Sequence, residues 1–323
     1  MTRRLACAVV FLALAAAPTA AADGAGPDPG LMQGWTGVTT AGHPWRYVTL
    51  PAGAQTVLAA VRRSTGRIPG WRPLRGTWGV PMVAYDGSVG GLSRDGRLLV
   101  LAQWSPPGNG ALRTTSRFLL LNTRTLRTWR TVTLRGDFTF DALSPGGGTL
   151  FLIERVSRAD TTKYRVRSYD IASQRLSPRV IADRRQAGWV MRGYPVTRAT
   201  SADGRWVYTL YQQPGGYPFV HALDAVGRSA VCIGLPWHGV QDILPSSRLR
   251  LNEQAGKLWV QTYRGRALFS IDTRSFWVAR AGAGASGTPA ALLVAPPLGA
   301  AALLALVLAF RRRLRAAVSL VRR

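Results

Sequence analysis

The sequence predicts an all-β domain built from a repeated four-stranded antiparallel unit, with one apolar segment at each end of the chain. Two observations carry this prediction. One kind of tight turn followed by a strand recurs four times, and a second kind of turn recurs between those copies. A third observation supports it: Gly, Pro and Asp interrupt every apolar run of the middle within the length of a strand, and helical periodicity is absent there.

The first recurrent turn begins with Ser or Asn, contains Gly, and is followed at once by strand-forming residues. Ser or Asp side chains bond nearby backbone amides in such turns, and Gly supplies the positive φ that the chain reversal needs. The four copies are Ser93–Val100, Ser144–Phe151, Ser201–Tyr208 and Asn252–Trp259.

The second recurrent turn places Asn or Asp at the end of a strand, before a short polar segment. It occurs at Asn122, Asp170, Asp224 and Asp272, with spacings of 48, 54 and 48 residues, and 61–67 holds a degenerate copy. Two turn types alternating at a period near 50 predict a β-propeller with four strands in each blade. Residues 31–283 hold five such units, with six blades as the alternative count. A β-sandwich is the rival fold, but it would not predict the same two turns in the same order four times.

The S-x-D-G-R turn and the later Asp-x-x-Ser/Thr turn resemble those of the WD40-like and TolB-like propeller superfamily. The first is clearest at 201–205 and 93–97, the second at 170–173 and 272–275. The resemblance covers most of residues 45–280 and implies the propeller fold, while it says almost nothing about function. No Trp-Asp dipeptide closes the blades, so the chain differs from a typical WD40 protein.

The N-terminal residues 1–22 have the pattern of a signal peptide. Arg3 and Arg4 precede an apolar run from Leu5 to Ala17, which is too short to span a bilayer, and small residues at 20–22 suit cleavage. Residues 23–30 are then expected to form a flexible mature terminus of a bacterial exported protein.

The C-terminal region has the pattern of a membrane anchor. After a linker at 284–289, residues 290–310 carry no charge and are long enough to cross a bilayer as one helix. Arginines beside a span stay on the cytoplasmic side, so the basic tail at 311–323 is expected to lie inside, on anionic lipid. These features predict a single-pass protein of the cell membrane with its N-terminal domain outside.

The chain is strongly basic, with 42 Lys and Arg against 15 Asp and Glu and a net charge of +27. Only eight of the basic residues lie in the leader and the tail, so the middle is itself positive. Such a surface attracts polyanions. Outside the cytoplasm the expected partners are the membrane, an anionic glycan or an envelope protein, and nucleic acid is not expected.

Few residues of the sequence suit catalysis. His43, His221 and His238 are the only histidines, no metal-ligand spacing such as HExxH occurs, and Cys232 would be the only cysteine after the leader. We therefore expect neither a metal nor another cofactor, and we assign no catalytic residue. Cys232 lies in an apolar strand-like run and is expected to be a buried, inert thiol.

The favoured function is that of a binding or scaffolding module, and an enzyme is the less favoured reading. The alternative is a hydrolase or lyase that acts on envelope glycans or lactones at the central channel. Asp141 and Asp242 are the acids that could line this channel. Candidate ligand-binding residues are the aromatic and histidine side chains in loop-like contexts, which could face solvent: Trp45, Trp71, Trp189, Trp237, His238 and Tyr217. For the tryptophans, packing between blades is the alternative and is favoured over binding. The longest loops between predicted strands, 105–110 and 212–218, are expected at the recognition face.

Overall fold

The computed structural model describes residues 28–104, 112–183, 185, 190–213, 215–238 and 241–281. Across these ranges the chain forms β-strands joined by turns, without an α-helix, as the sequence predicts. The described ranges contain no helix that is long and apolar enough to cross a membrane. The expected signal peptide, linker, membrane helix and basic tail all lie outside the described residues.

The strands form five sheets, each built around four antiparallel strands in chain order, and we call these sheets blades 1 to 5. Blade 1 contains β2 (Gly34–Val38), β3 (Trp45–Ala52), β4 (Gln55–Arg62) and β5 (Gly70–Arg75). Blade 2 contains β6 (Trp78–Pro81), β7 (Leu98–Gln103), β8 (Thr115–Asn122) and β9 (Arg127–Arg135). The short β1 (Leu31–Met32) adds to blade 2 by pairing with β6.

The last three blades repeat this order. Blade 3 contains β10 (Phe138–Leu143), β11 (Thr149–Arg155), β12 (Lys163–Asp170) and β13 (Arg175–Ile181), and β14 (Met191–Arg192) pairs with β12. Blade 4 contains β15 (Tyr194–Thr200), β16 (Trp206–Gln212), β17 (Phe219–Asp224) and β18 (Ser229–Gly234). Blade 5 contains β19 (Ser247–Asn252), β20 (Lys257–Thr262), β21 (Ala267–Asp272) and β22 (Val278–Arg280).

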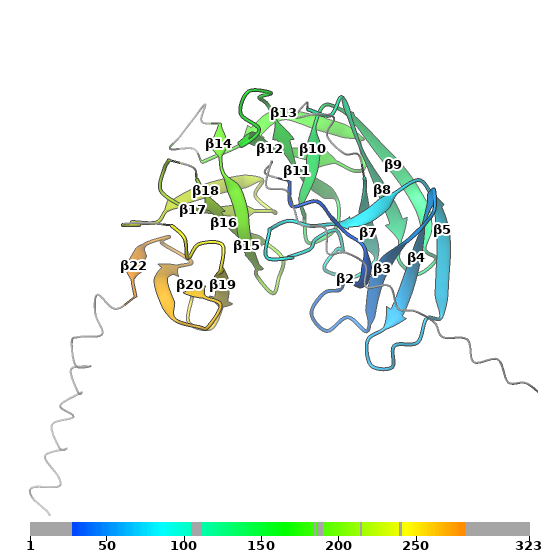
Figure 1. Cartoon of the computed structure of the whole chain (residues 1–323), viewed down its shortest axis with the longest axis horizontal. Coiled ribbons are helices and arrows are strands. Elements are labelled where there is room, and N and C mark those ends of the chain that lie inside the picture. Colours follow the sequence, from blue (N-terminus) through cyan, green and yellow to red (C-terminus); the bar gives the residue numbers. More distant parts are fainter. Residues whose placement is uncertain are drawn as a thin grey trace, which may run out of the picture.

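The blades follow one another around an arc, from β2–β5 in blue and cyan to β19–β22 in yellow and orange (Figure 1). Buried apolar clusters lie between blades 1 and 2, 2 and 3, 3 and 4, and 4 and 5. Among the described residues no such cluster joins blade 5 to blade 1. The small cluster of Val48, Ala59 and Val61 belongs to blade 1 alone. The predicted four-stranded units are therefore confirmed, whereas these contacts do not close the five blades into a ring.

The first recurrent turn has the hydrogen bonds that its sequence predicts. Ser93 donates its hydroxyl hydrogen to the Asp95 carboxylate over 2.6 Å, and the same carboxylate accepts the Arg97 amide over 3.0 Å. Gly96 has a φ of 69°. These bonds lie within five residues, which is why the turn could be recognised in the sequence.

The second recurrent turn has a feature that the sequence does not show. Each Asn or Asp is followed four residues later by a non-glycine residue with positive φ, and the described chain has no other non-glycine residue of this kind. These residues are Leu126, Gln174, Arg228 and Phe276, with φ between 51° and 59°.

Because a side chain in the left-handed region is strained, Gln174→Gly is expected to raise the free energy of unfolding by about 0.5–1 kcal/mol. Gln174 is exposed, so no packing is lost. The matched control is Gln55→Gly in β4, where glycine should destabilise. Urea unfolding of both variants checks the expectation, and a loss at position 174 as large as that at 55 would refute it.

The connection between β6 and β7 reaches from blade 2 to blade 4. Its Tyr85 amide donates to the Pro195 carbonyl over 2.9 Å, and its Asp86 amide donates to the Val196 carbonyl over 3.1 Å. Both acceptors belong to β15 of blade 4. These two hydrogen bonds join blade 2 directly to blade 4.

The end of the expected flexible segment, residues 28–30, differs from that expectation. The Asp28 carboxylate lies 3.3 Å from Arg113 and 3.1 Å from Arg155. Both arginines also pair with the buried Asp137, at 2.6 and 3.2 Å. Two carboxylates and two guanidinium groups thus neutralise one another, and they hold residue 28 against blades 2 and 3.

Candidate functional site

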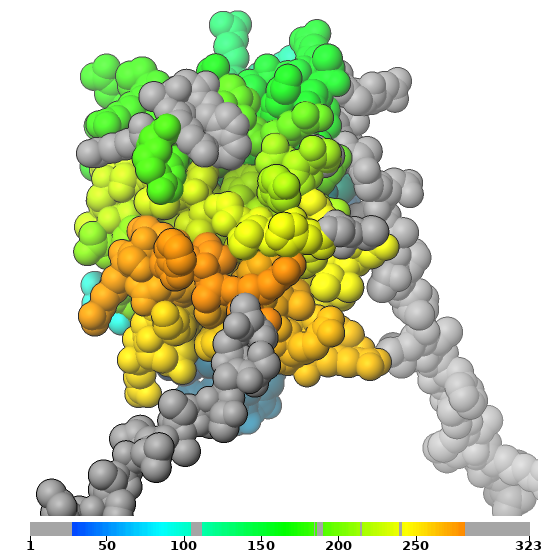
Figure 2. Space-filling view, turned by 90° about the vertical axis from the view of Figure 1, so that its left-hand side faces the viewer, coloured from blue at the N-terminus to red at the C-terminus, as the bar shows by residue number. Residues whose placement is uncertain are grey.

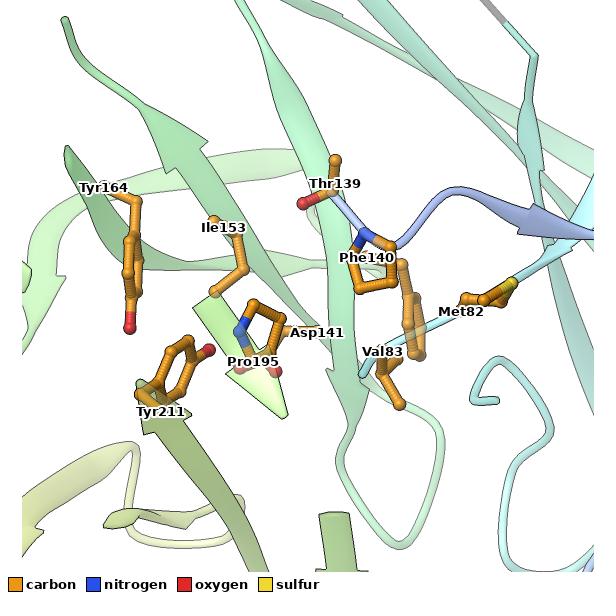
Figure 3. Close-up of a pocket in the computed structure, with 10 residues that line it drawn as sticks. Met82, Val83, Thr139, Phe140, Asp141, Ile153, Tyr164, Pro195 and Tyr211 are labelled. Atoms are coloured by element: carbon orange, nitrogen blue, oxygen red, sulfur yellow. The ribbon is translucent and has the colours of Figure 1, made fainter. Parts of the chain in front are cut away.

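The centre of the molecule holds a small cavity of about 10 Å³ at the meeting point of blades 2, 3 and 4 (Figure 3). Asp141 lies there among mainly apolar and aromatic side chains that include Tyr164 and Tyr211. The carboxylate forms an ion pair with Arg198 of β15, and both side chains are at least nine-tenths buried. Arg198 also donates to the Thr209 hydroxyl over 3.0 Å. The Asp141 carboxylate is therefore engaged in an ion pair that joins blades 3 and 4.

The acids suggested for a channel-centred reaction do not meet. Asp242 is exposed on the connection between β18 and β19, away from the cavity that holds Asp141. His238 is exposed on that same connection, and no hydrogen bond or ion pair joins it to an acid in the part of the chain that the structure describes. The described ranges also contain no group of three or more His, Cys, Asp or Glu side chains that could hold a metal ion.

The structure brings together two other groups that the sequence leaves unconnected, His221 and Cys232. The sulfur lies 3.6 Å from the imidazole Nδ1, and both residues are buried between blades 3 and 4. Burial lowers the pKa of His221 to about 4 and raises the pKa of Cys232 to about 12. Both are therefore neutral at pH 7, so the pair does not provide a thiolate nucleophile. The expected buried thiol is confirmed, since Cys232 is free and buried.

A groove of about 500 Å³ opens at the end of blade 4 opposite the Ser-x-Asp-Gly turns. It lies between the β16–β17 loop and the connection to blade 5. Tyr217, Trp237 and His238, which the sequence predicts as ligand-binding residues, all line it. The lining also includes three glutamine side chains: Gln212 and Gln213, which belong to the predicted loop 212–218, and Gln241, which the sequence does not point to.

Local hydrogen bonds fix the shape of this groove. Gln241 donates from its side-chain amide to the Gly216 carbonyl over 2.7 Å, which ties the two sides of the groove together. A Cβ at Gly216 would lie 2.7 Å from the Gln213 side chain, so glycine allows the close approach. Tyr217 is 66% exposed and presents its ring to solvent.

Trp237 lies in a loop, as predicted, but its ring does not face solvent freely. It is only 6% exposed and packs against Phe269 of blade 5 with ring centroids 5.5 Å apart. The contact between blades 4 and 5 takes most of its surface, because a large apolar ring gains more from burial than from exposure in a loop. Trp237 forms part of the floor of the groove, and Tyr217 is its exposed aromatic residue.

A second groove, of about 550 Å³, adjoins the first because Trp237 and His238 line both. It extends along blade 5, where Arg266 and Arg280 contribute to its lining. Both arginines are exposed, and neither forms an ion pair with another described residue. Neither groove is lined by Asp or Glu. We call the two together the blade 4–5 groove; Figure 2 shows the side of the molecule where yellow-green blade 4 borders yellow and orange blade 5.

The other predicted binding residues lie elsewhere. Trp45 begins β3 and is partly buried against the cluster between blades 1 and 2, with the Arg62 guanidinium 5.2 Å from its ring centroid. Trp71 is 63% exposed on β5. Trp189 lies outside the described residues, as does the loop 105–110. The structure thus brings together three of the six candidates.

Comparisons with known proteins give similarity of fold only. No protein-family model matches the chain, and no curated protein matches it significantly. Among solved structures, the Cps50 (Swd1) β-propeller domain of Myceliophteria thermophila is 13% identical, with a TM-score of 0.41. The alignment covers 73% of this chain and 62% of the Cps50 domain. This chain therefore matches less than two thirds of the length of that domain.

Two further solved structures are similar to the same degree. TolB from Acinetobacter baumannii is 12% identical over 74% of this chain and 58% of its own, with a TM-score of 0.34. The Dos1 propeller is 8% identical over 76% and 57%, with a TM-score of 0.42. Scores at this level carry no conclusion about activity, and the description of the fold rests on the strand pairings of this chain.

Proposed function

We propose that the chain is a binding module, tethered to the outer face of a cytoplasmic membrane, that holds an acidic glycan of the cell envelope in the blade 4–5 groove. One observation carries the proposal. The groove combines neutral hydrogen-bonding side chains, an exposed aromatic ring and two arginines, and among the described residues these arginines have no ion pair and no carboxylate lines the groove.

Each part of the groove suits a different part of such a ligand. The glutamine side chains offer amide donors and acceptors to sugar hydroxyls, and Tyr217 offers an apolar ring face with a polar tip. Arg266 and Arg280 can each bind a carboxylate or sulfate through two parallel hydrogen bonds. The neutral part would recognise the sugar, and the basic part would select the acidic form.

The membrane attachment is supported by the sequence of the two ends. A signal peptide at 1–22 would export the domain, and a span at 290–310 followed by arginines would keep it at the bilayer. The last described residue, 281, lies at the end of blade 5, and Ala281 itself lines the blade 4–5 groove. A ligand in the groove would therefore be bound close to the start of the proposed linker.

The hydrolase or lyase alternative has less support. Asp141 is engaged by Arg198, Asp242 is exposed, and the central cavity is only about 10 Å³. A catalytic pair of carboxylates would need two acids that face one substrate-sized space.

We expect the double variant Arg266→Gln, Arg280→Gln to bind an acidic oligosaccharide at least tenfold more weakly. Each substitution removes a charge-assisted hydrogen bond to the ligand. Binding of its carboxyl-reduced neutral form should change less than threefold. Calorimetry on the full chain in neutral detergent measures both affinities.

The matched control is Arg250→Gln with Arg274→Gln. Both residues are exposed on blade 5 and do not line the groove. Their substitution removes two positive charges, as the groove variant does. Equal losses in the groove and control variants would place the affinity in diffuse surface charge and would contradict the proposal. Absence of any binding by the unmodified chain would contradict it as well.

A further inference from the structure

A separate groove of about 670 Å³ runs between the outer strands of blades 1 and 2. Its floor contains apolar side chains from both blades, among them Leu74, Trp78 and Leu119. One wall is β5, and the other is formed by β8 and β9. It lies in a different pair of blades from the blade 4–5 groove, and it shares no lining residue with that groove.

Four arginines line this groove, and none of them forms an ion pair in the described part of the chain. They are Arg72 and Arg75 of β5, Arg117 of β8 and Arg127 of β9. No Asp or Glu contributes to the lining. Four positive charges around one concave surface repel one another, and an anion placed between them would be attracted by all four.

Arg72 of β5 is the least exposed of these four arginines. Its Nε atom is buried and has no hydrogen-bond partner. Buried polar atoms are nearly always bonded, and a guanidinium can only donate. A guanidinium group binds acceptors only, so the chemistry of Arg72 suits an oxyanion in the groove and excludes a cation.

The opposite wall adds hydroxyl donors at matched positions. Thr133 pairs with Arg117 across β8 and β9, and Thr131 pairs with Leu119. Since directly paired residues point to the same face of a sheet, the two threonines share the face of Arg117. Thr128 lines the groove as well, near Arg127. Guanidinium and hydroxyl groups together match the oxygen atoms of phosphate.

We propose that this groove binds a linear phosphate-bearing polymer, one strand of which lies between β5 and the β8–β9 wall. The basic residues stand on both walls of a concave surface, so a narrow chain can contact all four, whereas a flat bilayer contacts only their outer edges. The proposal does not depend on the function proposed for the blade 4–5 groove.

The test uses the full chain in neutral detergent with long-chain sodium polyphosphate as the probe, and affinity is measured at several salt concentrations. One arginine is removed from each wall, as Arg72→Gln with Arg117→Gln. We expect at least a tenfold loss of affinity and a shallower dependence of affinity on salt, because fewer counterions are released. The matched control, Arg67→Gln with Arg124→Gln, removes two exposed arginines of the same blades that do not line the groove and should change affinity less than threefold.

Further arms make the test decisive. A second groove variant, Arg75→Gln with Arg127→Gln, replaces exposed residues only and should show the same loss even if Arg72 proves necessary for folding. The Arg266→Gln, Arg280→Gln variant should keep polyphosphate affinity within threefold, which separates this site from the blade 4–5 groove. Equal losses in groove and control variants, no binding of polyphosphate, or groove-dependent binding only to phosphatidylglycerol vesicles would each overturn the proposal.

Discussion

Replacing Arg198 by methionine is expected to lower the free energy of unfolding by about 3–5 kcal/mol, the cost of leaving a buried carboxylate without its partner. Arg198 of β15 pairs with Asp141 of β10, and their side chains are only 9% and 3% exposed. Methionine keeps much of the volume of the side chain, so the loss reports the charge rather than a cavity. Urea unfolding followed by circular dichroism gives the difference.

Two further variants isolate this effect. Adding Asp141→Leu to Arg198→Met removes the stranded charge and should recover most of the lost stability. Arg97→Met breaks an exposed pair with Asp95, whose side chains are 82% and 48% exposed, and should cost less than about 1 kcal/mol. A loss at Arg198 no greater than at Arg97 would show that the pair between blades 3 and 4 is not buried as described.

The second large effect is a loss of stability in acid that is caused by His221. Burial lowers its pKa to about 4 in the folded chain, against 6.5 for an unperturbed histidine. Between these two values the unfolded chain binds a proton that the folded chain does not, so stability falls as the pH falls from 6.5 to 4. The full difference corresponds to about 3 kcal/mol.

His221→Leu is expected to remove this part of the pH dependence. The Nε2 atom of His221 is buried without a hydrogen-bond partner, so leucine strands no donor or acceptor there. The free energy of unfolding of both proteins is measured at pH 7 and pH 4.5. The unmodified chain should lose about 2–3 kcal/mol more than the variant over this interval. Equal losses would contradict the assigned burial and protonation state of His221.

The blades could be predicted from the sequence because their turns are local. Each Ser-x-Asp-Gly turn is closed by hydrogen bonds within five residues, as between Ser93 and Asp95, and these bonds need particular side chains. The arrangement of the blades depends on contacts between distant parts of the chain. The hydrogen bond from the Tyr85 amide to the Pro195 carbonyl joins blades 2 and 4, and no local sequence pattern predicts it.

The candidate site shows the same limit. Tyr217 and His238 were predicted from loop-like contexts, and both line the blade 4–5 groove. Arg266 and Arg280 were not predicted, because exposed arginines occur throughout this basic chain and only the fold shows which of them share a groove. Packing between blades was the alternative expected for Trp237, but the sequence could not name its partner Phe269, which lies 32 residues away.

The most direct test of the proposed function is to map where an acidic glycan touches the full chain, with a photoreactive acidic oligosaccharide and mass spectrometry of the labelled peptides. We expect the labels to concentrate in the peptides containing 212–218, 237–243 and 266–281, and we expect excess unlabelled acidic glycan to remove them. Labels spread evenly over arginine-bearing peptides of all five blades would contradict it.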